Sequence, residues 1–274
     1  MKKVSYQGVQ GAYSQSAAKK FFGEEIDTYG IDTFEEVLKS AIPDESPTDV
    51  NHCILPVENS IEGTVGQSID EIVKTDLYAI GEVYLKVEHC LIGRGKLNEV
   101  TIVYSHPQAL GQCSNFIKEH NLKTVPTYDT AGSVEIIKNL ENNCAAIASN
   151  LASNLYDVPI IKEGISNNAN NFTRFLVFSQ EKTIESGNDK TSIIFSVKHE
   201  PGALYQILKE FNDNDINLTK IESRPNKNTN WEYNFFVDFL GHSSNSKIKS
   251  VLDNIEKNTI FLKIIGSYPI AELD

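Results

Sequence analysis

Short apolar runs alternate with stretches of helical periodicity through the first 180 residues of the chain. Strands are predicted where such runs are bounded by polar or glycine-bearing turns, at residues 3–7, 52–56, 82–91, 101–105, 124–128, 144–149 and 173–179. Helices are predicted between them, at residues 15–22, from 33 onward, and at 66–75, 107–120, 130–140 and 150–156. Strands that alternate with helices predict an α/β architecture with largely parallel sheets.

Polar residues at the predicted helix starts support these assignments. Ser14 is a candidate N-cap for the first helix, and Asp129 or Thr130 caps a later one. Thr33 and Glu36 have the spacing of a capping box, in which each side chain accepts from the other's backbone N–H. We therefore expect helices to begin at these positions.

The pattern changes after residue 180. Residues 180–190 are polar, contain Gly and Ser, and predict a linker. Beyond it the predicted order is strand 191–198, helix 202–212, strands 217–223 and 233–241, helix 246–256 and strand 261–268, a ferredoxin-like βαββαβ unit. We expect a first domain over residues 1–180, made of two α/β subdomains that divide near residues 80 and 160 with a cleft between them, and a second domain over residues 190–274.

Composition agrees with a globular protein of two domains. The chain has 274 residues, of which 40% are hydrophobic and 23% charged. With 25 Lys and Arg against 37 Asp and Glu, its formal net charge is −12, which disfavours binding to nucleic acid or to anionic membrane surfaces. An anionic ligand would need a local positive site.

The cellular location of the protein is suggested by the targeting and membrane-spanning segments that the sequence lacks. Two lysines follow Met1 without an apolar run, so no signal peptide is expected, and no stretch of about 18 apolar residues predicts a membrane span. The four cysteines, at positions 53, 90, 113 and 144, show no CxxC spacing and are expected to be reduced. A cytoplasmic protein is the simplest interpretation.

Four predicted strand-to-helix turns carry the candidate chemistry. Ligands gather at the carboxyl ends of parallel strands, and helix N-termini there bind anions. The turns are Gly8 to Ser14, Glu58-Asn59-Ser60, Ser105-His106-Pro107-Gln108 and Asp129-Thr130-Ala131. Thr173-Arg174, at the start of a predicted strand, would add a hydroxyl and a bidentate cation. Taken singly, the same residues also fit plain helix caps and a surface arginine.

Common cofactor and metal motifs are missing. Gly8 and Gly11 fall short of GxGxxG, neither GxxxxGK[ST] nor HExxH occurs, and the six histidines show no metal-ligand spacing. We expect neither a cofactor nor a metal.

Read together, the motifs resemble the catalytic domain of prephenate dehydratase, followed by the ACT regulatory domain of that family. The resemblance covers the whole chain and is carried by Pro56-Val57-Glu58-Asn59-Ser60, Ser105-His106-Pro107-Gln108-Ala109-Leu110, Asp129-Thr130-Ala131, Asn171-Phe172-Thr173-Arg174-Phe175, Gly202-Ala203-Leu204-Tyr205 and Glu222-Ser223-Arg224-Pro225. The first turn departs from the family: Val9 and Ala12 stand where Pro and Thr are usual. No mutase-like segment precedes the dehydratase region, so a monofunctional chain is expected.

The resemblance implies a two-subdomain fold like that of periplasmic binding proteins, and decarboxylating dehydration of prephenate to phenylpyruvate in L-phenylalanine biosynthesis. Aromatisation drives this reaction without an electron-sink cofactor. The implied catalytic residues are Thr173, Arg174 and Glu58. Thr173 would assist the leaving hydroxyl, Arg174 would hold a carboxylate or brace the site, and Glu58 would hydrogen-bond the substrate or fix Asn59 or Arg174. Substrate contacts are implied for Asn59, Ser60, Ser105, Gln108, Thr130, Ala131 and Phe175.

The resemblance also implies feedback by L-phenylalanine as an allosteric effector. Its binding residues would be Gly202, Ala203, Leu204, Glu222, Ser223 and Arg224, between paired regulatory domains, in a homodimer or homotetramer. Two other interpretations stay open: an arogenate dehydratase, whose substrate carries an additional amine, and a non-catalytic amino-acid-binding sensor.

Overall fold

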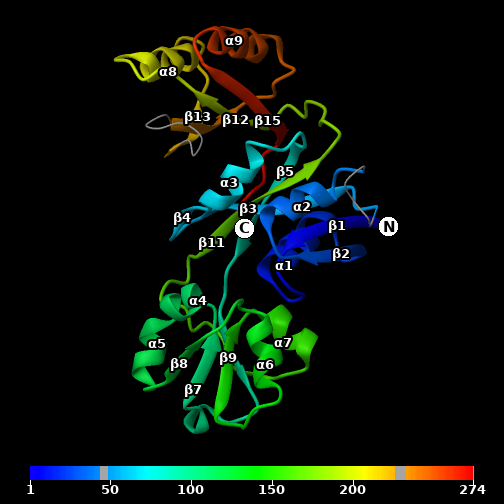
Figure 1. Ribbon diagram of the computed structural model, residues 1–274, viewed down its shortest axis with the longest axis vertical. Coiled ribbons are helices and arrows are strands. Elements are labelled where there is room, and N and C mark those ends of the chain that lie inside the picture. The colour runs from blue at the N-terminus through cyan, green and yellow to red at the C-terminus, as the bar shows by residue number, and fades with distance from the viewer. Residues whose placement is uncertain (44–48, 226–232, 274) are drawn as a thin grey trace.

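Three β-sheets follow one another along the longest axis of the molecule (Figure 1). The structure is a computed structural model and is described for residues 1–43, 49–225 and 233–273. A first lobe lies in the middle, a second lobe at one end and a helix-covered sheet at the other. The α/β class predicted from the sequence is confirmed.

The first lobe contains a sheet with the strand order β2-β1-β3-β11-β5. Strands β1 and β2 and strands β1 and β3 pair in parallel, whereas β11 is antiparallel to both β3 and β5. Its elements are β1 (Lys2–Gln7), α1 (Tyr13–Phe22), β2 (Ile26–Ile31), α2 (Phe34–Ser40), β3 (His52–Asn59), β4 (Gly63–Thr64), α3 (Gly66–Ile72), β5 (Tyr78–Lys86) and β11 (Phe172–Ser179).

The second lobe contains a sheet with the order β10-β6-β9-β7-β8. Strand β7 is parallel to β8 and β9, and β6 is antiparallel to β9 and β10. Its elements are β6 (Cys90–Gly93), the 3-10 turn η1 (Leu97–Glu99), β7 (Ile102–Ser105), α4 (Pro107–Gln112), α5 (Ser114–Glu119), β8 (Lys123–Pro126), α6 (Gly132–Ile137), β9 (Cys144–Ala148), α7 (Asn150–Tyr156) and β10 (Ile160–Lys162).

The chain crosses between the lobes twice. The first crossing, residues 87–89, interrupts the single strand predicted at 82–91, because β5 ends at Lys86 and β6 begins at Cys90 in another sheet. The second crossing, residues 163–171, returns the chain to β11. These two crossings define the hinge region of the molecule (Figure 1).

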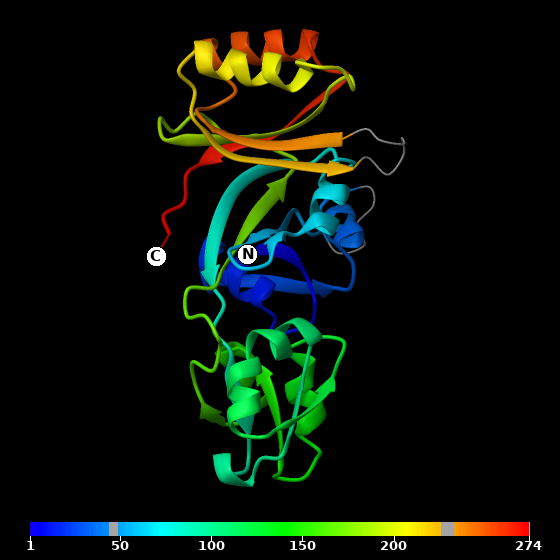
Figure 2. The same cartoon turned by 90° about the vertical axis from the view of Figure 1, so that its left-hand side faces the viewer.

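The third sheet has the order β13-β14-β12-β15, and its elements follow the predicted βαββαβ order. They are β12 (Asp189–Ser196), α8 (Ala203–Asp213), β13 (Leu218–Pro225), β14 (Tyr233–Leu240), α9 (Ser246–Lys257) and β15 (Phe261–Pro269). Figure 2 shows both helices on one face of this sheet, where Phe195, Phe211 and Phe239 form part of an apolar core.

The opposite face of the third sheet packs on the first lobe (Figure 2). Ile194, Phe236, Ile265 and Tyr268 share a single buried cluster with residues of the first lobe such as Phe178. The two domains are therefore joined by a common hydrophobic core.

Several predictions of local structure were wrong. The sheets are mixed rather than largely parallel, because β5, β6, β10 and β11 run against their neighbours. Strand β2 was not predicted, since its residues are half-buried and carry polar side chains. The helix expected at 107–120 is divided at Cys113.

The predicted caps gave mixed results. Thr33 caps α2 by accepting from the backbone N–H of Glu36. Helix α1 begins earlier than expected, so that Ala12 is its N-cap residue and Ser14 lies buried inside the helix. Within the described ranges, no helix combines the length and apolar character needed to cross a membrane.

Candidate active site

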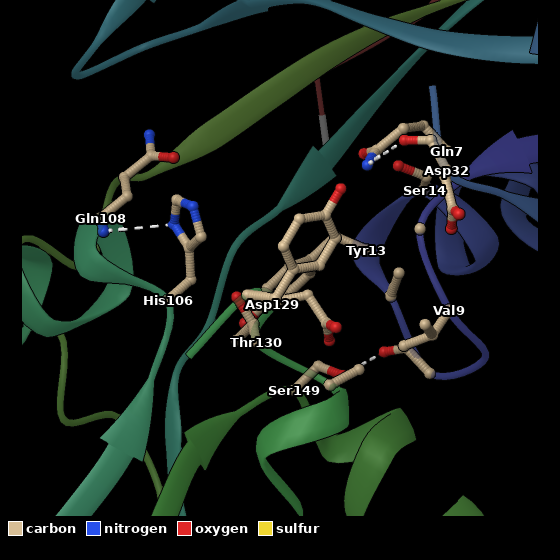
Figure 3. Close-up of a pocket in the computed structure, with 15 residues that line it drawn as sticks. Gln7, Val9, Tyr13, Ser14, Asp32, His106, Gln108, Asp129, Thr130 and Ser149 are labelled. Atoms are coloured by element: carbon tan, nitrogen blue, oxygen red, sulfur yellow. Dashed lines mark hydrogen bonds between the residues drawn. The ribbon is translucent and has the colours of Figure 1, made fainter. Parts of the chain in front are cut away.

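A cavity of about 380 Å³ lies between the two lobes (Figure 3). The first lobe contributes the turn after β1, and the second contributes the turns after β7 and β8 together with Ser149. Three of the four turns singled out in the sequence therefore meet here. The lining residues are Gln7, Gly8, Val9, Gly11, Ala12, Tyr13, Ser14, Asp32, His106, Gln108, Tyr128, Asp129, Thr130, Ala131 and Ser149.

Backbone conformation and one contact between the lobes shape this cavity. Gly11 has a φ of +87°, and a Cβ there would lie 3.1 Å from the Cα of Ala152, so the glycine permits close approach of the lobes. The hydroxyl of Ser149 donates to the Gly11 carbonyl at 2.9 Å. Gln108, Thr130 and Ala131, three residues predicted to contact substrate, line the cavity.

Ser105 does not lie at this surface. Its side chain is fully buried, and its hydroxyl donates to the Ile147 carbonyl of the neighbouring strand at 2.7 Å. The hydroxyl is used inside the sheet, and the substrate contact of Ser105 stays a prediction. The neighbouring His106 does line the cavity, and its Nδ1 accepts from the backbone N–H of Gln108.

Thr173 lies at the start of β11, beside the turn that follows β3. Asn59 Nδ2 lies 3.0 Å from Thr173 Oγ1 and 2.7 Å from Asn171 Oδ1. Asn59 Oδ1 accepts from the backbone N–H groups of Ile61 and Glu62, both at 3.0 Å. Those two donors fix the orientation of the amide, so its NH2 group must face Thr173.

The direction of this hydrogen bond determines what Thr173 can do. A hydroxyl is one donor and an acceptor. Because Thr173 Oγ1 accepts from Asn59, its own hydrogen is available to donate to a leaving oxygen. Thr173 is not among the residues that line the 380 Å³ cavity.

Two further predicted substrate contacts have structural roles here. Ser60 Oγ accepts from the Phe172 N–H at 2.9 Å and donates to the Asn170 carbonyl at 3.2 Å, which fastens the start of β11. Phe175 is 2% exposed and packs with Val4 and Tyr6 in the core of the first lobe. Phe175 shares a strand face with Thr173, two residues earlier, but its ring lies in the core beneath α1 and does not line the cavity.

Arg174 is buried between the first lobe and the third sheet. Its Nε donates to Glu82 at 2.7 Å, its Nη1 to Asp238, and its Nη2 to the Tyr268 hydroxyl at 2.9 Å. Lys190 also binds Glu82 at 2.7 Å, so two cations face two carboxylates. Burial opposes the charge of Arg174, but Tyr268, Asp238 and Glu82 together outweigh it and raise the pKa of the guanidinium.

Glu58 also faces the third sheet. Its carboxylate lies 2.9 Å from Lys220 Nζ of β13 and 3.9 Å from Arg174 Nη1. Arg174 and Glu58 are therefore engaged with the second domain, and neither lines the cavity. Of the two roles considered for each, a substrate contact or a brace, their contacts favour the brace.

The six residues expected to bind phenylalanine lie on two elements. Gly202, with a φ of +87°, is the N-cap residue of α8, which Ala203 and Leu204 begin. Glu222, Ser223 and Arg224 belong to β13, an edge of the third sheet. Arg224 reaches the first lobe, where its Nε lies 3.2 Å from Asp70 and its head group fills the space beside Gly66.

The sequence interpretation missed three residues at the hinge. His89 lies in the first crossing, Asn171 ends the second, and Gln112 ends α4. Gln112 is one turn beyond Gln108, a spacing that places both amides on the same helix face and could have pointed to it. Asn171 was named only as the first residue of the motif that contains Thr173, and His89 gave no signal, because its contacts join distant segments.

The fold and the cleft define the class of protein: a two-lobed α/β domain with a polar cavity between its lobes, joined to a βαββαβ domain. Among the described residues, no group of three or more His, Cys, Asp or Glu is placed to hold a metal ion.

Comparisons with known proteins give the family. Residues 4–183 match the prephenate dehydratase family model, and residues 191–257 match the ACT domain model. Prephenate dehydratase from Methanocaldococcus jannaschii is 36% identical over 99% of each chain. Arogenate dehydratase/prephenate dehydratase 2 from Arabidopsis thaliana is 36% identical over 98% of this chain and 73% of its own.

A solved structure is similar throughout. Prephenate dehydratase from Arthrobacter aurescens, in complex with L-Phe, is 26% identical with a TM-score of 0.88, over 98% of this chain and 90% of its own. The chain belongs to the prephenate dehydratase family. Its first domain has the two-lobed fold resembling periplasmic binding proteins, and its second is an ACT domain.

Proposed function

We propose that this chain converts prephenate to phenylpyruvate, CO2 and water. In this step the bond to the ring carboxylate breaks, and its electron pair enters the ring. The ring C–O bond breaks at the opposite carbon, and the departing hydroxide takes up one proton to leave as water. The observation that carries the proposal is the hydrogen bond from Asn59 to Thr173, because it leaves the threonine hydrogen free to donate to a leaving oxygen.

The cavity residues have complementary tasks in this proposal. The lining turns from both lobes, with Gln108 and Thr130, hold and orient the substrate. Orientation of this kind accounts for barrier lowering of about 7–11 kcal/mol in well-aligned reactions. Arg174 and Glu58 act as braces that hold the Thr173 strand and the Asn59 turn against the ACT domain.

The test is product formation. Purified protein incubated with prephenate, then made alkaline, should develop the ultraviolet absorbance of phenylpyruvate. Absence of product while the protein binds L-phenylalanine would reject the proposal and support the amino-acid sensor. Arogenate is assayed in parallel, since its product is phenylalanine; turnover of arogenate with none of prephenate would make the chain an arogenate dehydratase.

We propose further that L-phenylalanine binds the ACT domain as an allosteric effector, at the α8 N-terminus and β13. The Arthrobacter aurescens relative was crystallised with L-Phe, which supports this proposal. Strand β13 is an edge strand of its sheet, and its Ile221 side chain is exposed. Such an edge is suited to pairing with a second copy of the chain. A homodimer or homotetramer would be seen by light scattering, whereas a monomer at all concentrations would contradict it.

A cytoplasmic location is also proposed. The four cysteines are buried free thiols, and burial raises the pKa of Cys113 to about 12, which keeps that thiol protonated. Free thiols are the norm in a reducing compartment. Fractionation of cells that produce the protein tests this.

A further inference from the structure

An unbroken chain of side-chain hydrogen bonds runs from Thr173 to His89. Asn59 Nδ2 bridges Thr173 Oγ1 and Asn171 Oδ1, at 3.0 and 2.7 Å. Asn171 Nδ2 donates to Gln112 Oε1 at 3.1 Å. Gln112 Oε1 in turn lies 3.0 Å from His89 Nε2. His89 and Asn171 are 2% and 0% exposed, so most of the chain is shielded from water.

The donor and acceptor at each hydrogen bond in this series follow from the Asn59 end. The Asn59 amide is fixed by the two backbone N–H groups that its oxygen accepts. Its NH2 group then requires an oxygen on Asn171, which turns the Asn171 NH2 group towards Gln112. Gln112 must therefore present its oxygen to both Asn171 and His89.

His89 stands at the far end and must supply a hydrogen. An oxygen that faces a ring nitrogen at 3.0 Å is an acceptor, so His89 Nε2 carries the proton. Burial lowers the pKa of His89, which favours the neutral ring. Its Nδ1 is then the acceptor and lies 3.0 Å from the Tyr13 hydroxyl. That hydroxyl has a single hydrogen, which is shared between Nδ1 and the Glu88 carbonyl 2.7 Å away.

This series of hydrogen bonds connects the parts of the molecule that meet at the hinge. His89 lies in the first crossing between lobes, and Asn171 ends the second. Gln112 belongs to α4 of the second lobe, and Asn59 belongs to β3 of the first. A change in the angle between the lobes would thus disturb the hydrogen bond that orients Thr173.

We propose that His89 is a positioning residue for the dehydration, acting on Thr173 through Gln112, Asn171 and Asn59. It is not a proton donor to the substrate. Its Nε2–H holds the Gln112 oxygen in place, and the three amides carry that constraint to the threonine hydroxyl. The inference rests on the role proposed for Thr173.

The first test compares substitutions at His89 by steady-state kinetics. His89→Leu removes the donor and should lower kcat about 10- to 100-fold, as small misplacements do, while KM changes by less than about threefold. His89→Gln restores an N–H near the position of Nε2 and should recover kcat to within about fivefold of the wild type. His242→Leu is the matched control, because His242 is a histidine buried in the ACT domain, 5% exposed, and should leave kcat unchanged.

Two kinetic outcomes would overturn the proposal. One is wild-type kcat in His89→Leu. The other is equal loss of kcat in His89→Leu and His89→Gln, because a structural role alone would not distinguish a leucine from a hydrogen-bond donor.

The second test needs no substitution and no substrate. In wild-type protein labelled with 15N-histidine, NMR at pH 7 should assign the proton of His89 to Nε2. A proton on Nδ1 alone, or on both nitrogens, would overturn the proposal. If the protein makes no phenylpyruvate, the proposed function fails. This spectrum would still decide whether His89 Nε2 donates to Gln112, as the inferred direction of the hydrogen bonds requires.

Discussion

Thr173 and Arg174 are neighbours in sequence with opposite surroundings. Thr173 accepts a hydrogen bond from Asn59, whereas Arg174 is buried between Glu82 and Asp238. Because successive side chains of a strand point to opposite faces, Thr173 and Arg174 lie on opposite sides of β11. The roles proposed for the two residues differ accordingly.

The hydroxyl of Thr173 is expected to be essential for turnover. Thr173→Val keeps the shape and loses the donor, so kcat should fall by about 100-fold or more, the range that a positioned proton donor contributes. Thr173→Ser keeps the hydroxyl and should retain most of the activity. Equal kcat in Thr173→Val and wild type would remove the role, and unchanged circular dichroism would show that the fold is intact.

Arg174 is expected to matter chiefly for stability. Arg174→Met leaves Glu82 and Asp238 buried with a cation missing, and breaking a buried pair in this way typically costs about 3–5 kcal/mol. Urea unfolding measures it. The control is Lys209→Gln, which breaks an exposed ion pair on α8 and should barely move the midpoint. Equal midpoints for the two variants would contradict the brace.

At this scale the sequence identified the motif but not its geometry. Thr173 was predicted from its resemblance, and its partner Asn59 came from the same set. The partners of Arg174 were not predictable, because Glu82 and Asp238 lie 92 and 64 residues away along the chain. Ser105 and Phe175 are buried, and their substrate contacts stay predictions, since a motif does not tell whether a side chain faces the cleft or the core.

Strand β15 packs closely on β5 of the first lobe. A Cβ on Gly266 would lie 2.1 Å from the Ala79 carbonyl oxygen of β5, so only a glycine allows this contact. The fold within each domain followed hydrophobic periodicity. Contacts such as this one, and the division of residues 82–91 between two sheets, depend on tertiary packing that periodicity does not record.

Gly266→Ala should therefore loosen the ACT domain. The new methyl meets backbone, which cannot yield as a flexible side chain can, and overpacking of this kind costs about 1–3 kcal/mol. Gly111→Ala is the control, because nothing lies within 4 Å of its Cβ position and alanine is the better helix former. The melting temperature should fall in the first variant and not in the second; a fall in both would contradict the packing argument.

At the scale of the whole molecule, the first and third sheets are held together by buried polar groups as well as by apolar contacts. Tyr268 of β15 is fully buried in the shared core, with its hydroxyl against Arg174 and Ser192. Burial first, and then the nearby Asp238, raise the pKa of Tyr268 well above its usual value. This coupling makes the joint between the domains sensitive to alkali.

The sign of that sensitivity follows from linkage. A pKa that is higher in the folded protein stabilises it below about pH 10, the unfolded value, and the stabilisation is lost as pH rises towards the folded value. The free energy of unfolding, from urea titrations, should decline above pH 10 by at most about 1.4 kcal/mol per pH unit for this residue. Tyr268→Phe should make the decline shallower, and identical slopes in both proteins would refute the assignment.

The shared core also limits how feedback control could be engineered. Ile194, Phe236, Ile265 and Tyr268 of the ACT domain complete the cluster that contains Phe178 of the first lobe. A truncation after the linker would expose that apolar surface to water together with the Arg174 and Glu82 charges. Single substitutions at the L-phenylalanine site proposed above are therefore a better route to relieving feedback than removal of the domain.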